Sequence, residues 1–243
     1  MVQEKALRTA VSKLIQSYIL LIKDFSLEDF LKSGVDPFRF KFNVELWGLK
    51  KSVRKEIEHK IEMKLENLMG DFHEDYLGKT IDIKTKNPWR IVPKGELPGV
   101  DIANDAENKF LQIKSKFNSM NSSSSNRLAE EIEQLKKQKP TAQIGCGFII
   151  AKPGQAAIGE SVIKSVGGLI FKGKSLYSYV TNNSQEMDEI IEKFPIMVRD
   201  LKSSYNFDEL LNQASERIIN ELDKEAKKKG KILEDYLYHD AVG

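Results

Sequence analysis

Residues 98–125 read PGVDIANDAENKFLQIKSKFNSMNSSSS, and this stretch decides the expected fold. Two short β-like runs within it are separated by a polar turn, NDAEN, at residues 104–108. Polar turn residues between two apolar runs favour antiparallel pairing, so the pattern predicts a β-hairpin. The hairpin would bring Asp101, at the end of the first run, beside Gln112 and Lys114 of the second run at one sheet edge.

The segments around this hairpin predict a larger sheet. From residue 80 to 117 the runs IDIK, WRIV, GVDI and KFLQIKSKF alternate with turn residues, which indicates an antiparallel meander. A helical pattern at 126–139 ends at Pro140, and the apolar run at 144–151 reads as a buried strand. Because strand, helix and strand form a crossover unit, the last strand should run parallel to the meander strand that precedes the helix. We therefore expect an α/β fold with a mixed central sheet flanked by helices.

The remaining segments are mostly helical in pattern. Apolar residues at helical spacing predict helices at 5–25, 52–77, 185–203 and 207–229, and alternation at 175–181 predicts a further strand. We expect one domain over residues 1–243. Its parts would be N-terminal helices at 1–78, the core sheet and crossover helix at 79–152, and a C-terminal strand and helices at 153–243.

Composition limits the class of protein. The formal net charge is only +2, with 38 Lys plus Arg against 36 Asp plus Glu, so affinity for a polyanion must come from local clustering. The single cysteine, Cys146, excludes an intrachain disulfide and a multi-cysteine zinc site, and its apolar surroundings predict a packing role. The chain has no signal-peptide pattern and no apolar run of about 20 residues. We expect a cytoplasmic protein that does not span a membrane.

The residues that the hairpin brings together suit phosphodiester hydrolysis. This reaction needs charge neutralised on the phosphate and a water made nucleophilic, and bound Mg²⁺ assists both. Asp101 would be the anionic ligand, and the side-chain oxygen of Gln112 and the backbone carbonyl of Ile113 would complete an oxygen-only set. Lys114 would project from the same strand face as Gln112 and contact the phosphate or the attacking water.

The segment that follows offers polar groups before a predicted helix. Small donors and acceptors at a helix N-terminus suit phosphates and base edges. The candidate DNA-binding residues are Lys116, Asn118, Ser119, Asn121, Ser122 and Ser123. Two ordinary explanations compete: a flexible loop has a similar composition, and Lys114 and Lys116 could line an exposed edge strand while Asp101 caps the turn.

At these residues the chain resembles type II restriction endonucleases of the PD-(D/E)XK nuclease superfamily. The GVDI run followed by QIKSKFNSMNSSSS is similar in particular to the group that cleaves GGNCC-type sites, as are DPFRFKF at 36–42 and LMGDFHEDYLG at 68–78. The resemblance implies Mg²⁺-dependent cleavage of double-stranded DNA at a short palindrome, a homodimer, and a restriction-modification system. A two-fold symmetric protein would also match the identical half-sites of a palindrome.

Gln112 departs from the family pattern, which has Glu or Asp at this position. The neutral amide removes one negative charge and should weaken cation binding. Glu62 or Glu66 of the predicted helix at 52–77 could compensate, or both could be solvated helix charges. His73 has no spaced histidine partner, so a hydrogen-bonded structural role is favoured over a general base. Two alternatives stay open: a DNA-binding module with lost or weak nuclease activity, and an α/β protein whose motif is accidental.

Overall fold

A computed structural model of the chain describes residues 2–32, 34–116, 120–151 and 159–239. Contacts divide the chain into two compact units. The sheet unit comprises Met1–Leu14 and Met69–Leu201, and the helical unit comprises Ile15–Leu68 and Lys202–Gly243. Helices α1 (Val2–Asp24) and α4 (Leu49–Leu77) contribute residues to both units. None of the helices in the described ranges is both long and apolar enough to cross a membrane.

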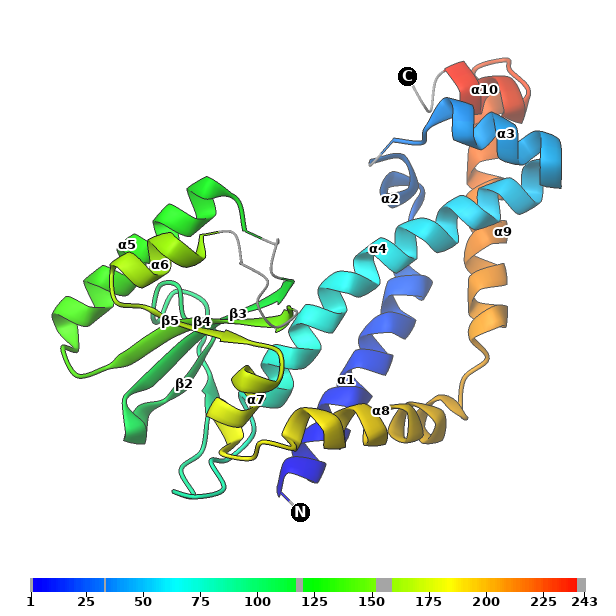
Figure 1. The fold of residues 1–243 in the computed structure, drawn as a ribbon. Coiled ribbons are helices and arrows are strands. Elements are labelled where there is room, and N and C mark those ends of the chain that lie inside the picture. Colours follow the sequence, from blue (N-terminus) through cyan, green and yellow to red (C-terminus); the bar gives the residue numbers. More distant parts are fainter. Residues whose placement is uncertain (1, 33, 117–119, 152–158, 240–243) are drawn as a thin grey trace. The chain divides into compact units, whose positions relative to one another are not determined.

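The sheet unit contains a mixed five-stranded sheet (Figure 1). Its strands, in spatial order, are β1 (Arg90–Ile91), β2 (Ile102–Asn104), β3 (Lys109–Lys116), β4 (Gln143–Ile150) and β5 (Leu169–Lys172). The first three strands pair antiparallel, whereas β3–β4 and β4–β5 are parallel, which confirms the predicted meander and crossover. The predicted position at a sheet edge is wrong, because β3 pairs with a strand on each side and is the central strand.

Helices α5 (Ser122–Gln138) and α6 (Glu160–Ser165) cover one face of this sheet (Figure 1). The apolar side of α5 packs Leu128 and Ile132 into a cluster with Phe110 and Phe148 of the sheet. Cys146 is fully buried in the same cluster, and this burial raises the pKa of its thiol to about 12. Cys146 therefore stays a neutral thiol near neutral pH, which agrees with the predicted packing role.

The opposite face of β4 is lined by glycines that permit close packing. A Cβ on Gly147 would lie 2.4 Å from Leu176 Cδ1, and a Cβ on Gly145 would lie 2.5 Å from the Leu169 carbonyl oxygen. Leu176 belongs to α7 (Lys174–Thr181), so the strand predicted at 175–181 is wrong. Helical spacing buries Leu176, Tyr177 and Val180 in α7. The additional strand of the sheet is β5, which precedes α7 in the chain and pairs with β4.

The strand predicted for the IDIK run at 81–84 is also absent, and this segment makes only an isolated bridge between Ile81 and Pro88. The carboxylate of Asp82 accepts backbone N–H groups from Lys84 at 2.9 Å and Thr85 at 3.0 Å. An aspartate that accepts nearby N–H groups replaces the strand ladder by a turn. The side-chain amide of Asn182, just after α7, donates to both oxygens of Asp82.

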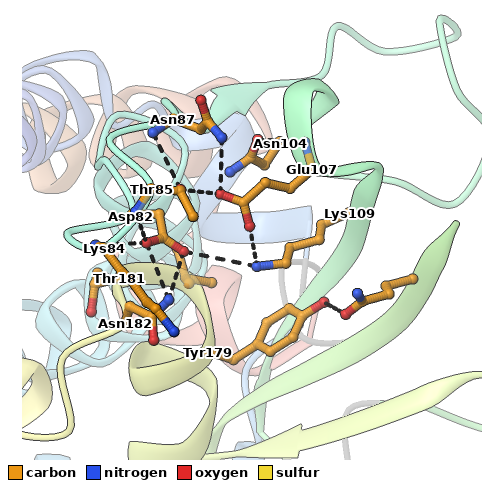
Figure 2. Close-up of polar contacts among 12 residues, drawn as sticks. Asp82, Lys84, Thr85, Asn87, Asn104, Glu107, Lys109, Tyr179, Thr181 and Asn182 are labelled. Atoms are coloured by element: carbon orange, nitrogen blue, oxygen red, sulfur yellow. Dashed lines mark hydrogen bonds and ion pairs between the residues drawn. The ribbon is translucent and has the colours of Figure 1, made fainter.

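This turn belongs to a polar network at the start of β3 (Figure 2). Lys109 forms ion pairs with Glu107 and, at 3.8 Å, with Asp82. Its ammonium group also lies 5.0 Å from the ring centroid of Tyr179, whose hydroxyl donates to Gln143. The network therefore ties the turn after α4 and the β2–β3 hairpin to α7 and the start of β4.

We expect the Asp82→Ala substitution to lower the free energy of unfolding by about 1–3 kcal/mol, because the Lys84 and Thr85 N–H groups and the Asn182 amide lose their buried acceptor, while Lys109 keeps its ion pair with Glu107. Burial alone would raise the pKa of Asp82, but the N–H groups of Thr85 and Lys84, the amide of Asn182 and the charge of Lys109 hold it below its ordinary value. Its stabilisation is thus present above the unfolded pKa of about 3.9 and is lost as the pH falls through the lower folded pKa.

Urea denaturation across a pH series checks this expectation. The wild type should lose stability steeply in acid, and the Asp82→Ala protein should lose less over the same interval. Asp24→Ala removes an exposed aspartate at the end of α1 and serves as the control. Equal free energies of unfolding for the two variants would show that the buried network contributes no more than a surface charge.

The helical unit is built from parts of α1 and α4 together with α2 (Leu27–Lys32), α3 (Pro37–Trp47), α9 (Phe207–Lys228) and α10 (Leu233–His239). Its apolar core includes Ile22, Phe25, Phe30, Phe40, Ile57, Ile61, Ile218 and Leu222. α8 (Glu186–Lys202) lies in the sheet unit up to its final residue. The four long helices predicted from the sequence are α1, α4, α8 and α9, each with ends within three residues of those expected.

Candidate active site

The backbone of Asp101 lies between β1 and β3. Its N–H donates to the Leu111 carbonyl at 2.9 Å, and its carbonyl accepts the Val92 N–H at 2.8 Å. The side chain points to β3, where Oδ2 accepts the Ile113 N–H at 2.6 Å. The predicted hairpin is therefore present, and it places the Asp101 carboxylate against residues 112–114.

The side chains of Gln112 and Lys114 lie on the same face of β3, because residues two apart in a strand point the same way. Extending the Ile102–Leu111 register by one residue sets Gln112 opposite Asp101. Lys114 is half-buried beside Phe148 of β4, and among the described residues its ammonium group has no hydrogen bond or ion pair. Burial raises the pKa of Asp101, while the Ile113 N–H and the charge of Lys114 act in the opposite direction. The carboxylate thus lies in a desolvated position where a positive charge would stabilise it.

A third ionisable group, Glu74 of α4, lies in the same place. Burial, together with the charges of Asp101 and Asp71, raises the pKa of Glu74 to about 7, although the charge of Lys114 acts in the opposite direction. Glu74 is therefore close enough to Asp101 and Lys114 to interact with both. Sequence reasoning did not find Glu74.

The sequence offers Glu62 and Glu66 as candidates to assist Asp101 or as solvated helix charges, and both belong to the helical unit. Glu74 continues their four-residue spacing along α4 past a glycine, Gly70. A Cβ on Gly70 would lie 2.8 Å from Ser115 Oγ, so the glycine allows α4 to approach β3 closely one turn before Glu74. A glycine inside a helical pattern often has a packing reason, so Gly70 was the feature of the sequence that could have pointed to the turn of α4 that contains Glu74.

His73 precedes Glu74 but serves a structural purpose. Its Nδ1 lies 2.7 Å from the Tyr177 hydroxyl, and burial lowers its pKa to about 4. The imidazole is therefore neutral near neutral pH and hydrogen-bonded to α7, as the sequence predicted.

The serine-rich segment forms the first turn of α5, four residues before the predicted start at 126. Asn121 Oδ1 accepts the Ser124 N–H at 2.8 Å, and Ser124 Oγ accepts the Asn121 N–H at 2.9 Å. This reciprocal capping box explains the early helix start and excludes a flexible loop for residues 122–125. Ser122 and Ser123 are exposed in this turn, whereas the predicted DNA contacts Asn118 and Ser119 lie outside the described residues.

The residues around Asp101 offer oxygen ligands for a cation, and two of these residues are acids. Within the described ranges, no group of three or more His, Cys, Asp or Glu is placed to hold a metal ion. Asp101 and Glu74 supply carboxylates, Gln112 supplies an amide oxygen, and Oδ1 of Asp101 accepts no hydrogen bond from another described residue. An all-oxygen set with limited negative charge fits a hard cation such as Mg²⁺ better than it fits zinc or copper.

The mixed sheet flanked by helices is compatible with the fold of restriction endonucleases, which are hydrolases that act on DNA. Residues 1–203 match the family model described as Eco47II restriction endonuclease. The chain therefore belongs to the Eco47II restriction endonuclease family and is a type II restriction endonuclease. No curated protein matches it.

Proposed function

We propose that the protein cleaves both strands of DNA at a short palindrome of the GGNCC type. It would use Mg²⁺ and act as the nuclease of a cytoplasmic restriction-modification system. The observation that carries the proposal is the contact of the Asp101 carboxylate with the Ile113 N–H, which holds this acid against Gln112 and Lys114. The family match supports the reaction class.

Each residue of the site would have a defined task. Asp101, Glu74, the Gln112 amide oxygen and the Ile113 carbonyl would hold the cation. Bound Mg²⁺ lowers the pKa of a coordinated water and neutralises charge on the phosphate. Lys114 would orient the attacking water or donate to a phosphate oxygen, because its charge acts on Asp101 and Glu74 while its ammonium group forms no ion pair with a described residue.

The start of α5 would hold the DNA. Its first N–H groups have no partner within the helix and suit phosphate oxygens, and the exposed Ser122 and Ser123 add hydroxyl donors. Lys116, at the end of β3, and the amide nitrogen of Asn121 would add further contacts. Asn118 and Ser119, between them in the sequence, complete the proposed set. A good bidentate base contact contributes about 1–3 kcal/mol of discrimination, so a few contacts per subunit, doubled by symmetry, would give site specificity.

Digestion of plasmid DNA tests this function. Discrete fragments should form with Mg²⁺ and should be absent with EDTA, and sequencing the fragment ends should give a GGNCC-type palindrome. Cleavage without site preference would contradict the specificity. A salt-sensitive gel shift without cutting would favour the alternative, a DNA-binding module whose nuclease activity is lost.

The neutral Gln112 gives a direct test of cation binding. The Gln112→Glu substitution restores an acid where the related enzymes have one, and we expect it to lower the Mg²⁺ concentration for half-maximal cleavage about tenfold, which corresponds to about 1.4 kcal/mol. Titrating Mg²⁺ in a cleavage assay measures this shift. Gln138→Glu, at the exposed end of α5, is the control. An unchanged or higher Mg²⁺ requirement for Gln112→Glu would place Gln112 outside the cation site.

We also propose a homodimer, in which a second copy covers an apolar stripe on α3. Phe38, Phe42 and Leu46 recur every four residues, and their exposed fractions are 85%, 64% and 54%. Contiguous exposed apolar patches of this kind mark interaction surfaces. In an antiparallel pair of α3 helices centred on Phe42, Phe38 of each copy would lie opposite Leu46 of the other, so the stripe is self-complementary.

Phe42→Glu should dissociate this dimer, because it places two like charges at the centre of the apolar contact. We expect the dissociation constant to rise at least about 100-fold. Sedimentation equilibrium of wild type and variant measures this change. Ile191→Glu, on α8, alters a residue of similar exposure (59%) and should leave the dimer intact. A Phe42→Glu protein with wild-type association would exclude α3 as the interface.

A further inference from the structure

The helical unit contains a cavity of about 310 Å³ between α4 and α9. Basic and amide side chains dominate its lining, and one carboxylate is present. The lining residues are Lys50, Lys51, Arg54, Asn212, Ser215, Glu216, Ile219 and Asn220. The protein as a whole carries a net charge of only +2, so three cationic side chains around one cavity are a local concentration of positive charge.

The three cations differ in how they are held. Arg54 is fixed by Glu58 at 2.6 Å, by Asp208 at 3.8 Å and by a hydrogen bond to Asn212. Lys50 and Lys51 are exposed and form no ion pair with another described residue. The charge of Arg54 is therefore mostly balanced by its acidic neighbours. The charges of the two lysines are not balanced in this way.

The position of these lysines adds to that charge. They lie in the first turn of α4, a helix of 29 residues with no acidic residue in its first turn. The N-terminal end of a helix carries partial positive charge and normally favours Asp or Glu, so two lysines there are locally unfavourable. A bound anion would reverse this penalty.

We propose that this cavity binds a backbone phosphate of the DNA other than the phosphate at the bond that is cut. The proposal rests on the proposed DNA-cleaving function. Lys50 and Lys51 would provide charge, and the Asn220 amide, which has no hydrogen bond to another described residue, would donate to a phosphate oxygen. Glu216 lies on the α9 side of the cavity and would direct the anion towards the lysines of α4.

Salt dependence of DNA binding tests the proposal in the full chain. Affinity for a duplex that contains the cleaved site is measured in EDTA from about 50 to about 200 mM salt. Each lost phosphate contact changes the slope of log K against log salt by about 0.9, so Lys50→Ala/Lys51→Ala should make the slope less negative by about 1–2. Lys50→Arg/Lys51→Arg keeps the charges and should retain the wild-type slope. A cooperative thermal transition of the alanine variant, at a melting temperature no lower than that of the wild type, would show that it is folded.

The matched control is Lys227→Ala/Lys228→Ala, which removes two lysines of α9 that are each paired with an acid. Its slope should equal that of the wild type. Equal slopes for both alanine variants would overturn the proposal, although plasmid cleavage by the wild type would leave the proposed function standing. Inorganic phosphate should compete with DNA for the wild type but not for Lys50→Ala/Lys51→Ala. Phosphate that binds without displacing DNA would assign the cavity to free anions and would also overturn the proposal.

Discussion

Lys114→Ala should abolish DNA cleavage and retain DNA binding. Lys114 is half-buried in the central strand, its charge acts on Asp101 and Glu74, and it forms no ion pair with a described residue. Removing a group that orients water or stabilises developing charge lowers the rate by about 10²–10⁴-fold. Single-turnover cleavage at saturating Mg²⁺ measures the loss, and a gel shift in EDTA measures binding.

Two further variants separate the possible tasks of Lys114. Lys114→Arg keeps a positive charge but holds its proton far more tightly. Partial activity of this variant would therefore indicate an electrostatic task, whereas no activity would indicate that the amine must exchange a proton or fit a compact position. Lys137→Ala, on α5, removes an exposed lysine and should cleave at the wild-type rate. Cleavage by Lys114→Ala at that rate would remove Lys114 from the mechanism.

Local patterns in the sequence were sufficient to predict the core of the sheet unit. The β2–β3 hairpin follows from apolar runs on either side of a polar turn, and the β3–α5–β4 crossover follows from a helical pattern between two apolar runs. Asp101 was placed correctly against residues 112–114 because hairpin pairing is a short-range property. The roles of these residues in catalysis are a proposal that the variants above test.

Other elements depend on contacts that a local pattern does not contain. Residues 175–181 form α7 because Gly147 leaves room for Leu176, and residues 81–84 turn because Asp82 captures nearby N–H groups. Both segments have β-like composition, but packing and side-chain hydrogen bonds override that preference. Glu74 was missed for a related reason: its approach to Asp101 depends on the contact of Gly70 with β3, which is far away in the sequence.

Glu74→Gln tests whether that contact completes the active site. The amide has nearly the same shape but no charge, and Gln112 is already neutral, so Asp101 would be the only acid left among the proposed ligands. We expect cleavage to fall about 100-fold and the Mg²⁺ requirement to rise, since ligand charge sets the affinity of such sites. Glu62→Gln and Glu66→Gln provide the comparison, because the sequence offers these acids of the same helix as candidates. Full activity of Glu74→Gln with loss of activity in either comparison variant would assign the second acid of the site to Glu62 or Glu66 in place of Glu74.

The Glu74→Gln substitution should raise the melting temperature of the metal-free protein although it lowers the cleavage activity. Without metal, the half-buried Glu74 carboxylate is repelled by Asp101 and Asp71, and the charge of Lys114 opposes this. Glu74→Gln removes the repulsion, so we expect a higher melting temperature than wild type in EDTA at neutral pH. Mg²⁺ should narrow the difference because the wild type binds it more tightly. A variant that is both inactive and less stable in EDTA would mean that Glu74 supports the packing of α4 on β3, whereas lost activity with gained stability is the result expected of a cation ligand.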